Sequence, residues 1–325
     1  MKEVKIKGVG SYVPSQVITN DDLSKIVDTN HQWILERTGI CERRISEGED
    51  TSSIAYKAAK VAMDKASIKG EEIDLIIVAT ITPDSFTPSV ACILQKMIGA
   101  KNATAFDLNA ACTGFIYSLE VAESLLKTGR YKNALVVGAE TLSKIIDWKD
   151  RSTCVLFGDG GGAAVIGIDE EEESGIINTY SISEGEKGDA LTAGANDVIN
   201  PFAKEEVIKS KYVQMNGREV FRFATGAMVD SIKKVLEGTG YNLEDIDYVV
   251  PHQANLRIID YAAKKLGLSK EKFYVNLERV GNTSSASVPM ALADMDNEGK
   301  LKDGDLIVLV GFGGGLTCGA TLIKW

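Results

Sequence analysis

The sequence predicts an α/β protein built from two similar halves, and three observations lead to this prediction. Segments of strand and helix character alternate along all 325 residues. Several segments of the first half recur in the second half in the same order. Hydrophobic residues make up 44% of the chain and charged residues 25%, as in an ordinary globular protein. We expect the halves to cover residues 1–172 and 173–325.

The first half shows strand and helix patterns in alternation. The start of the chain, MKEVKIKGVGSYVP, alternates like a strand, and residues 51–67 have helical spacing with apolar side chains on one side. The next elements complete a βαβαβ unit: a strand at 71–80, a helix at 87–98, a strand at 103–108, a helix from Cys112 and a strand at 133–140. The run CVLFGDGGGAAVIG, at 154–167, is expected to form a strand pair bent at its glycines.

The second half repeats this plan. EDIDYVVPHQ resembles EEIDLIIVAT, and GDLIVLVGFGGG resembles NALVVGAE. Asp74 and Asp247 are 173 positions apart, and the same offset carries Cys112 onto Ser285. The turn that begins one central helix is therefore expected beside the corresponding turn of the other half. Residues 181–202, which are rich in Gly, Asp and Asn, are expected to form a long loop that is either a lid or an insertion.

Charge and composition exclude several classes of protein. Lys and Arg total 36 against 46 Asp and Glu, and the net charge of −10 argues against general attraction to nucleic acid or to an anionic membrane. No apolar run approaches the roughly 18 residues of a membrane span, and the start of the chain does not resemble a signal peptide. The five cysteines are dispersed and form no CxxC pair, so we expect free thiols, no metal site and a cytoplasmic location.

A few residues have the positions that catalysis requires. Cys112 lies where a short strand turns into a helix, and the N–H groups and dipole of a helix start favour a thiolate. His252 follows an apolar strand at its carboxyl end, where ligands bind in α/β sheets. Asn282 lies in a turn, where it is either catalytic or a helix cap. His31 is expected to be solvated. Residues 313–315 are glycines without the spacing of a dinucleotide site, and they suit close approach to a reacting carbonyl.

These motifs together resemble the β-ketoacyl-acyl carrier protein synthase III family of the thiolase superfamily. The matching motifs are AACTGF, PHQANLRI, GNTSSAS and the terminal GFGGG, together with RTGICERR at 37–44 and DRSTCVLFGDG at 150–160. The resemblance implies a thiolase-like five-layer αβαβα fold and a homodimer. It also implies condensation of an acyl-CoA primer with malonyl-acyl carrier protein at the start of fatty-acid synthesis. Acyl-CoA would be a substrate, with no other cofactor and no metal.

The resemblance also implies roles for individual residues. Cys112 would carry the acyl group, and the backbone N–H groups of Cys112 and Gly314 would hold the oxyanion. His252 and Asn282 would act as neutral donors to the enolate formed by decarboxylation. Phe312 would lie near the departing carboxylate, where poor hydration favours loss of CO₂.

Coenzyme A recognition is expected from an aromatic residue and two arginines. The family pattern places Trp33, Arg37 and Arg151 around the adenine and the phosphates, and a guanidinium suits a phosphate while an indole suits a purine. His31 and Gln32 replace the acidic pair that often precedes this tryptophan.

Primer size and carrier-protein docking are assigned to separate positions. Thr87 stands where some acetyl-using relatives have a phenylalanine that closes the acyl pocket, so we expect a deeper pocket here. The helix after PHQAN places Arg257, Lys264 and Lys265 on its exposed side, with Arg222 as a neighbour on another helix. We expect these cations to dock the acidic acyl carrier protein.

Alternatives within and outside the superfamily remain. A polyketide-type priming synthase has the same site pattern. Elongating synthases need a second histidine, thiolases need a cysteine before the terminal glycines rather than Cys318 after them, and hydroxymethylglutaryl-CoA synthases need a glutamate at the end of the 71–80 strand, which reads VAT. The order Cys, His, Asn also occurs in papain-like thiol hydrolases, but the repeated βαβ pattern disfavours that class. A catalytically silent binding protein would not show selective alkylation of Cys112.

Overall fold

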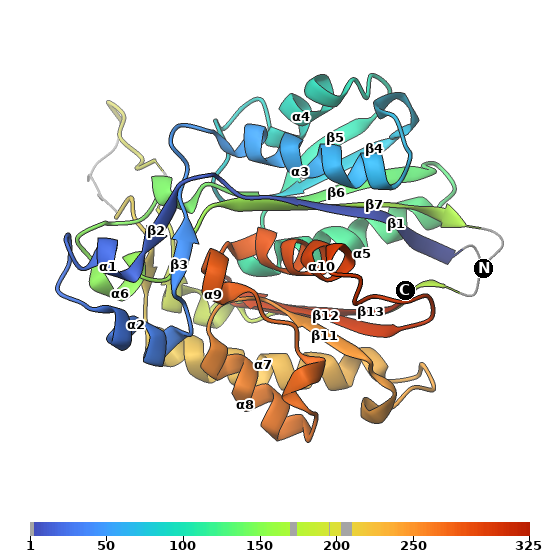
Figure 1. Cartoon of the computed structure of the whole chain (residues 1–325). Coiled ribbons are helices and arrows are strands. Elements are labelled where there is room, and N and C mark those ends of the chain that lie inside the picture. Colours follow the sequence, from blue (N-terminus) through green and yellow to red (C-terminus); the bar gives the residue numbers. More distant parts are fainter. Residues whose placement is uncertain (1–2, 170–173, 195, 203–209) are drawn as a thin grey trace.

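The computed structural model describes residues 3–169, 174–194, 196–202 and 210–325, and these residues form five layers (Figure 1). Two sheets enclose a central pair of helices, and further helices cover the outer face of each sheet. The main helices are α3 (Thr51–Lys65) and α4 (Val90–Ile98) on the first sheet, α5 (Gly114–Lys127) and α10 (Ser287–Asn297) between the sheets, and α7 (Gly217–Leu236) and α8 (Leu256–Leu266) on the second sheet. The expected five-layer αβαβα fold is confirmed.

The first sheet has five strands in the order β1-β7-β6-β4-β5. Their bounds are β1 (Glu3–Tyr12), β7 (Gly160–Asp169), β6 (Asn133–Glu140), β4 (Leu75–Ala79) and β5 (Thr104–Leu108). The strands β4, β5 and β6 run parallel, whereas β7 is antiparallel to both β6 and β1. All of β4 is buried, as expected for a strand covered by helices on both faces. The βαβαβ unit expected between 71 and 140 is confirmed.

The second sheet has four strands in the order β11-β12-β13-β8. Their bounds are β11 (Tyr248–Pro251), β12 (Leu306–Gly313), β13 (Thr317–Lys324) and β8 (Gly175–Ser183). The pair β11 and β12 is parallel, and β13 is antiparallel to both β12 and β8. Beside β11, a single bridge between Val249 and Phe273 stands where the first sheet has its fifth strand. The two sheets therefore share one plan, with the edge strand reduced in the second.

The offset of 173 positions is visible in the elements themselves. The strand β6 (133–140) corresponds to β12 (306–313) without a shift, and the short 3-10 helix η1 (Gly70–Glu72) corresponds to η5 (Leu243–Asp245). The turns η2 (Ala111–Thr113) and η7 (Ser284–Ala286), which precede α5 and α10, correspond in the same way. The repeat expected from the sequence is therefore present in the fold. The expected boundary between 172 and 173 lies outside the described residues.

Small elements complete the described chain. They are β2 (Val17–Thr19), α1 (Asn20–Leu23), α2 (His31–Thr38), β3 (Glu42–Arg44), η3 (Leu142–Lys144), α6 (Arg151–Cys154), η4 (Gly185–Ala190), β9 (Leu191–Thr192), β10 (Gln214–Met215), η6 (Lys270–Lys272) and α9 (Leu277–Val280). Within the described residues, no helix is both long enough and apolar enough to cross a membrane.

Three expectations about local structure were wrong. The helix expected from Thr87 begins at Val90, because the Ser89 side chain caps it by accepting a hydrogen bond from the Cys92 N–H. The expected strand pair at 154–167 is the end of α6 followed by the single strand β7. The expected loop at 181–202 contains the end of β8, then η4 and β9.

Candidate active site

Cys112 lies in the turn η2, between the carboxyl end of β5 and the start of α5. The preceding residue, Ala111, has a φ of 46°, a left-handed conformation that is unusual for a residue with a side chain. The Thr113 hydroxyl lies 2.9 Å from the Thr317 hydroxyl of β13 and ties this turn to the second sheet. Cys112 is thus held in a strained turn at the junction of the two halves, with 7% of its surface exposed.

The terminal glycines lie directly against Cys112. A Cβ atom on Gly313 would lie 2.8 Å from both the N and the Cβ atoms of Cys112, which is closer than real contacts allow. Only glycine therefore permits the end of β12 to lie beside the cysteine. Gly314 follows, and it lines the same cavity as Cys112. Cys112 and Gly314, the two residues expected to form the oxyanion hole, therefore line the same cavity.

His252 lies at the end of β11 and is almost completely buried. Its backbone N–H donates to the Val310 carbonyl at 2.8 Å, and its Nδ1 atom lies 2.6 Å from the Ser287 hydroxyl. Its ring meets the Phe312 ring edge to face, with the centroids 5.1 Å apart. Burial lowers the pKa of His252 to about 3, so the imidazole is neutral at physiological pH.

Asn282 is buried in the segment that precedes η7 and α10. Its backbone N–H donates to the Leu156 carbonyl, and its carbonyl accepts from the Gly158 N–H. Its side-chain Oδ1 accepts from the Ser284 N–H at 2.9 Å, so the amide Nδ2 is the end that can donate to a ligand. Ser284 has a φ of 49° and is the counterpart of Ala111 at the offset of 173.

The Ser284 hydroxyl is buried beside the same cavity as Cys112 and has no hydrogen-bond partner among the described residues. Burial raises the pKa of Cys112 to about 12, the Ser284 hydroxyl acts in the opposite direction, and the charge of an ionised Glu140 adds to the rise. The dominant shift is opposite to the one expected from the start of a helix, because desolvation of a buried anion outweighs the favourable turn geometry. Cys112 is therefore a thiol in the resting protein.

A cavity of about 990 Å³ opens onto Cys112. Both halves contribute to its wall, and so do residues 191–194 and Asn196 of the segment that was expected to be a loop. Phe86 also lines it although its side chain is 78% exposed, whereas the neighbouring Thr87 is exposed and does not line it. The role of Thr87 in primer size stays a prediction.

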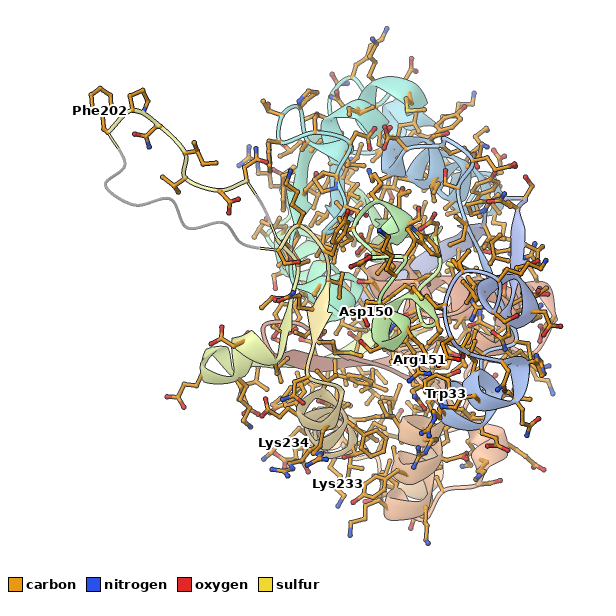
Figure 2. All side chains as sticks on the ribbon, turned by 90° about the vertical axis from the view of Figure 1, so that its left-hand side faces the viewer. Trp33, Asp150, Arg151, Phe202, Lys233 and Lys234 are labelled. Carbon is orange, nitrogen blue, oxygen red and sulfur yellow. The ribbon has the colours of Figure 1, made fainter. Side chains whose placement is uncertain are left out.

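Trp33 and Arg151 lie next to each other on the surface (Figure 2), and Arg37 contacts the same Trp33 ring. The guanidinium carbon lies 4.7 Å from the Trp33 ring centroid for Arg37 and 5.0 Å for Arg151. Arg151 also donates to the Asp28 carbonyl at 2.6 Å. The Trp33 ring packs on a buried apolar cluster, and this cluster includes Phe157, which lines the cavity. The Trp33 ring and part of the cavity wall thus belong to one apolar cluster.

The expected docking residues lie on the outer layer of the second half. Arg257, Lys264 and Lys265 are exposed on α8, and Arg222 is exposed on α7. The Arg257 guanidinium lies 5.9 Å from the ring of Phe221, which is the neighbour of Arg222 in the chain. The two helices therefore bring Arg257 beside Phe221 of α7, and a docking surface that combines Arg257 with Arg222 stays a prediction.

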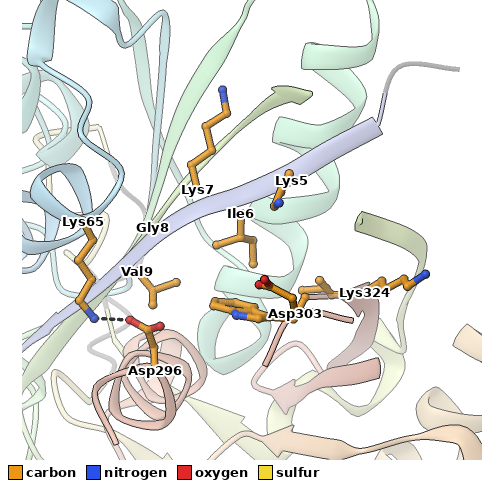
Figure 3. Close-up of a pocket in the computed structure, with 11 residues that line it drawn as sticks. Lys5, Ile6, Lys7, Gly8, Val9, Lys65, Asp296, Asp303 and Lys324 are labelled. Atoms are coloured by element: carbon orange, nitrogen blue, oxygen red, sulfur yellow. Dashed lines mark hydrogen bonds and ion pairs between the residues drawn. The ribbon is translucent and has the colours of Figure 1, made fainter. Parts of the chain in front are cut away.

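A second cavity, of about 400 Å³, lies at the other end of the strands (Figure 3). Its wall includes Lys324 of β13, which pairs with Leu306 at the start of β12, far along the strand from Gly313. It contains none of the expected site residues. The cavity beside Cys112 is therefore the candidate active site.

Sequence reasoning missed Ser284, Ser287, Glu140 and Phe86. The first three act through side-chain contacts between segments distant in the chain, which a single sequence does not reveal. Phe86 carried a weak signal, since a large apolar residue in the polar segment PDSFTP has no core to join.

Comparisons with known proteins give one consistent result. A sequence model described as 3-Oxoacyl-[acyl-carrier-protein (ACP)] synthase III matches residues 106–185, and the model of its C-terminal part matches 236–325. Beta-ketoacyl-[acyl-carrier-protein] synthase III of Clostridium novyi and that of Clostridium acetobutylicum are each 59% identical over 100% of this chain, covering 100% and 99% of theirs. The crystal structure of 3-oxoacyl-[acyl-carrier-protein] synthase III from Aquifex aeolicus is 48% identical, with a TM-score of 0.93 over 99% of this chain and 100% of that chain.

Proposed function

Because this chain belongs to the 3-oxoacyl-[acyl-carrier-protein] synthase III family, we propose that it condenses an acyl-CoA primer with malonyl-acyl carrier protein. The products are a 3-oxoacyl-acyl carrier protein, CO₂ and free coenzyme A, and the reaction starts fatty-acid synthesis. The observation that supports this most directly is Cys112, a buried thiol at the wall of a large cavity, with the terminal glycine backbone against it.

In the first half-reaction the Cys112 sulfur attacks the thioester carbonyl of acyl-CoA. A new carbon–sulfur bond forms, the bond to coenzyme A breaks, and the proton of the Cys112 thiol ends on the departing coenzyme A sulfur. Because the pKa of Cys112 is about 12, this proton leaves as the attack proceeds rather than beforehand. The N–H groups of Cys112 and Gly314 stabilise the oxyanion, and one such donor is worth roughly 10²–10³ in rate.

In the second half-reaction the malonyl thioester loses CO₂ and becomes an enolate. The neutral His252 ring and the Nδ2 amide of Asn282 donate to its oxygen and hold the charge that develops there. Phe312, packed edge-on against His252, supplies an apolar surface near the carboxylate. The enolate carbon then attacks the acyl carbonyl on Cys112, a carbon–carbon bond forms, the carbon–sulfur bond to Cys112 breaks, and the released thiolate takes a proton from water.

The adenine and phosphates of coenzyme A, and the acyl carrier protein, bind to the surface outside the cavity. Trp33 offers its ring to adenine, and Arg37 and Arg151 offer guanidinium groups to phosphates. Arg257, Lys264, Lys265 and Arg222 attract the acidic carrier protein despite the net charge of −10. Two observations support these surfaces. Arg37 and Arg151 lie within 5.0 Å of the Trp33 ring centroid, and the arginines and lysines of both surfaces are exposed.

The chain also has a surface suited to a second copy of itself. The strand β5 pairs with β4 on one side and is the last strand of its sheet, and Phe106 and Leu108 of β5 are only partly buried. Proteins cover or pair such an edge, because an exposed strand edge is open to pairing with other chains. We infer a homodimer, and sedimentation of the purified protein would measure it.

Covalent acylation tests the proposed nucleophile. The protein is incubated with a panel of radiolabelled acyl-CoA primers without malonyl-acyl carrier protein, and the labelled peptide is identified. We expect one stable label per chain, on the peptide that contains Cys112, and none in Cys112→Ala. Cys92→Ser is the matched control, since Cys92 is an exposed free thiol. Label at wild-type level in Cys112→Ala would overturn the assignment.

A further inference from the structure

Glu140 is a completely buried carboxyl at the carboxyl end of β6. Its Oε2 atom accepts three hydrogen bonds: from the Ile81 N–H at 3.1 Å, the Thr80 hydroxyl at 3.1 Å and the Thr82 hydroxyl at 2.7 Å. Its Oε1 atom has one hydrogen-bond contact within the part of the chain that the structure describes, 2.9 Å from the Ser285 hydroxyl oxygen. The carboxyl therefore joins the wall at Thr80 and Ile81, which lines the active-site cavity, to the turn η7.

The contacts of Ser285 determine where a proton must lie. The Ser285 oxygen is 2.8 Å from the Ala79 carbonyl and 2.9 Å from Glu140 Oε1. A hydroxyl has one hydrogen, and neither a carbonyl nor an ionised carboxylate can donate. Two separate, well-aligned hydrogen bonds need a second hydrogen, and a protonated Glu140 supplies it by donating from Oε1 to Ser285, whose own hydrogen then points to Ala79.

The surroundings of Glu140 agree with a neutral carboxyl. Among the described residues, its hydrogen-bond partners are hydroxyls and one backbone N–H, and no described cation pairs with it. Burial raises the pKa of Glu140 above its ordinary value. A negative charge here would also raise the pKa of Cys112 and so oppose the attack that begins the reaction.

The position of Glu140 corresponds to the active site in the other half. At the offset of 173, Ser285 corresponds to Cys112, Ala79 to His252 and Glu140 to Gly313. Where the glycine backbone lies against Cys112, the Glu140 side chain reaches Ser285. Beside Ser285, the Glu140 carboxyl thus occupies the position that Gly313, which has no side chain, leaves empty beside Cys112.

We propose that Glu140 is a positioning residue that stays a neutral carboxylic acid, with its Oε1 proton donated to Ser285. It fixes the cavity wall at Thr80 and Ile81 to the turn η7, which carries Ser284 of the same cavity wall. Its neutrality leaves the Cys112 sulfur free of a nearby negative charge. The catalytic part of this inference rests on Cys112 as the nucleophile, whereas the protonation state can be measured independently.

Infrared difference spectroscopy tests the protonation state. A protonated carboxyl has a carbonyl stretching band that a carboxylate lacks, and the band shifts in D₂O. We expect this band at pH 8 in the wild type and in Glu123→Gln, and its loss in Glu140→Gln. Glu123 is the matched control, since it is a buried carboxyl paired with Lys127. Identical spectra for wild type and Glu140→Gln would overturn the proposal, even if Cys112 proved to be the nucleophile.

Alkylation of Cys112 tests the effect of neutrality on the site. Glutamine has the size of the neutral acid, donates to Ser285 and accepts from the Thr80–Thr82 segment. We expect iodoacetamide to label Cys112 in Glu140→Gln within about twofold of the wild-type rate at pH 8. An ionised Glu140 would instead predict a rise of roughly tenfold for each unit by which the Cys112 pKa falls, and that result would contradict the proposal.

Rescue by the conservative variant tests the positioning role. Glu140→Ala leaves the Ser285 oxygen and the Thr80–Thr82 segment without their shared partner, and we expect kcat of condensation to fall roughly tenfold or more. Glu140→Gln should restore kcat to within about threefold of the wild type. Equal losses in both folded variants, or no loss in either, would contradict it. If Glu140→Ala does not fold, Glu140→Gln and its infrared spectrum decide the matter.

Discussion

The Nδ1 atom of His252 lies 2.6 Å from the hydroxyl oxygen of Ser287 at the start of α10. The His252 ring is neutral, so one of its nitrogens carries hydrogen and the other accepts. In the tautomer in which Ser287 donates to Nδ1, the hydrogen lies on Nε2, the nitrogen that the proposed mechanism uses to donate to the enolate oxygen. The Ser287 hydroxyl is thus a means of selecting the tautomer that the condensation step requires.

Replacing Ser287 by alanine should therefore slow condensation without slowing acylation. We expect kcat for condensation to fall roughly tenfold, since the loss of one neutral hydrogen bond to the ring costs about 1 kcal/mol or more. Nitrogen NMR of histidine-labelled protein should show a mixed His252 tautomer in the variant. His31, the only other histidine and an exposed one, is the internal reference. An unchanged His252 signal would contradict the prediction.

Asn282→Ala should separate the two half-reactions. The variant keeps Cys112 and the terminal glycines, so acyl-CoA should still acylate it at close to the wild-type rate. Condensation should fall roughly 10²-fold or more, because one donor to the enolate is lost. Single-turnover measurements of acyl-enzyme formation and of CO₂ release give the two rates. Equal collapse of both steps would contradict this division of labour.

The buried His252 should make stability depend on pH. Its folded pKa is about 3 against an ordinary value of 6.5, so the unfolded chain binds the proton more readily between these values. Stability is therefore complete above pH 6.5 and is lost as pH falls, by about 2 kcal/mol between pH 7.5 and 5. Urea unfolding of wild type, His252→Gln and His31→Gln at each pH measures this. A wild-type slope that persists in His252→Gln, or disappears in His31→Gln, would contradict it.

Thr87→Phe should shift primer preference towards acetyl-CoA. The family resemblance, rather than the lining of the described cavity, places this position at the acyl pocket, and a ring there would shorten the space for the acyl chain. Each methylene that no longer fits would cost about 1–3 kcal/mol in discrimination. The measurement is kcat/KM for a series of linear and branched acyl-CoA primers. Phe86→Ala is the informative companion, since Phe86 lines the cavity and Thr87 does not. Strict acetyl preference in the unmodified protein would exclude the deeper pocket.

Arg257→Glu should impair carrier-protein use selectively. Reversal of this exposed charge should raise KM for malonyl-acyl carrier protein several-fold and weaken the salt dependence of that step, because the attraction is electrostatic. Acylation by acyl-CoA should change less. Lys101→Glu, an exposed residue just after α4 on the outer layer of the other half, is the matched control. Unchanged carrier-protein kinetics at low salt would place the docking surface elsewhere.

The backbone plan was predictable because it depends on patterns that repeat within the chain. The offset from Asp74 to Asp247 placed Ser285 opposite Cys112, and η2 and η7 lie at that spacing. The strand pair expected at 154–167 was wrong, since its glycines were interpreted as bends. In β7 they instead make room for α10: a Cβ on Gly162 would lie 2.5 Å from the Met290 N atom. Close packing between distant segments leaves no periodic signal.

The side chains around the site were less predictable for a related reason. Cys112, His252 and Asn282 belong to sequence motifs, whereas Ser287 and Glu140 matter through what they touch across the two halves. The sign of the Cys112 pKa shift was also missed, because the start of a helix is readable in the sequence but complete burial is not.

The offset of 173 between Cys112 and Ser285 also bears on symmetry. In a twofold dimer of a single half, both central turns would carry the same residue, because symmetry places identical side chains at equivalent positions. Joining the halves in one chain removes that constraint. One turn can then carry the thiol of Cys112 while the corresponding turn carries the hydroxyl of Ser285. The strand ends beside these turns can differ in the same way, as Gly313 and Glu140 do here. A single chain thereby has one turn with a reactive residue and one turn with a structural residue, both built on the same repeated plan.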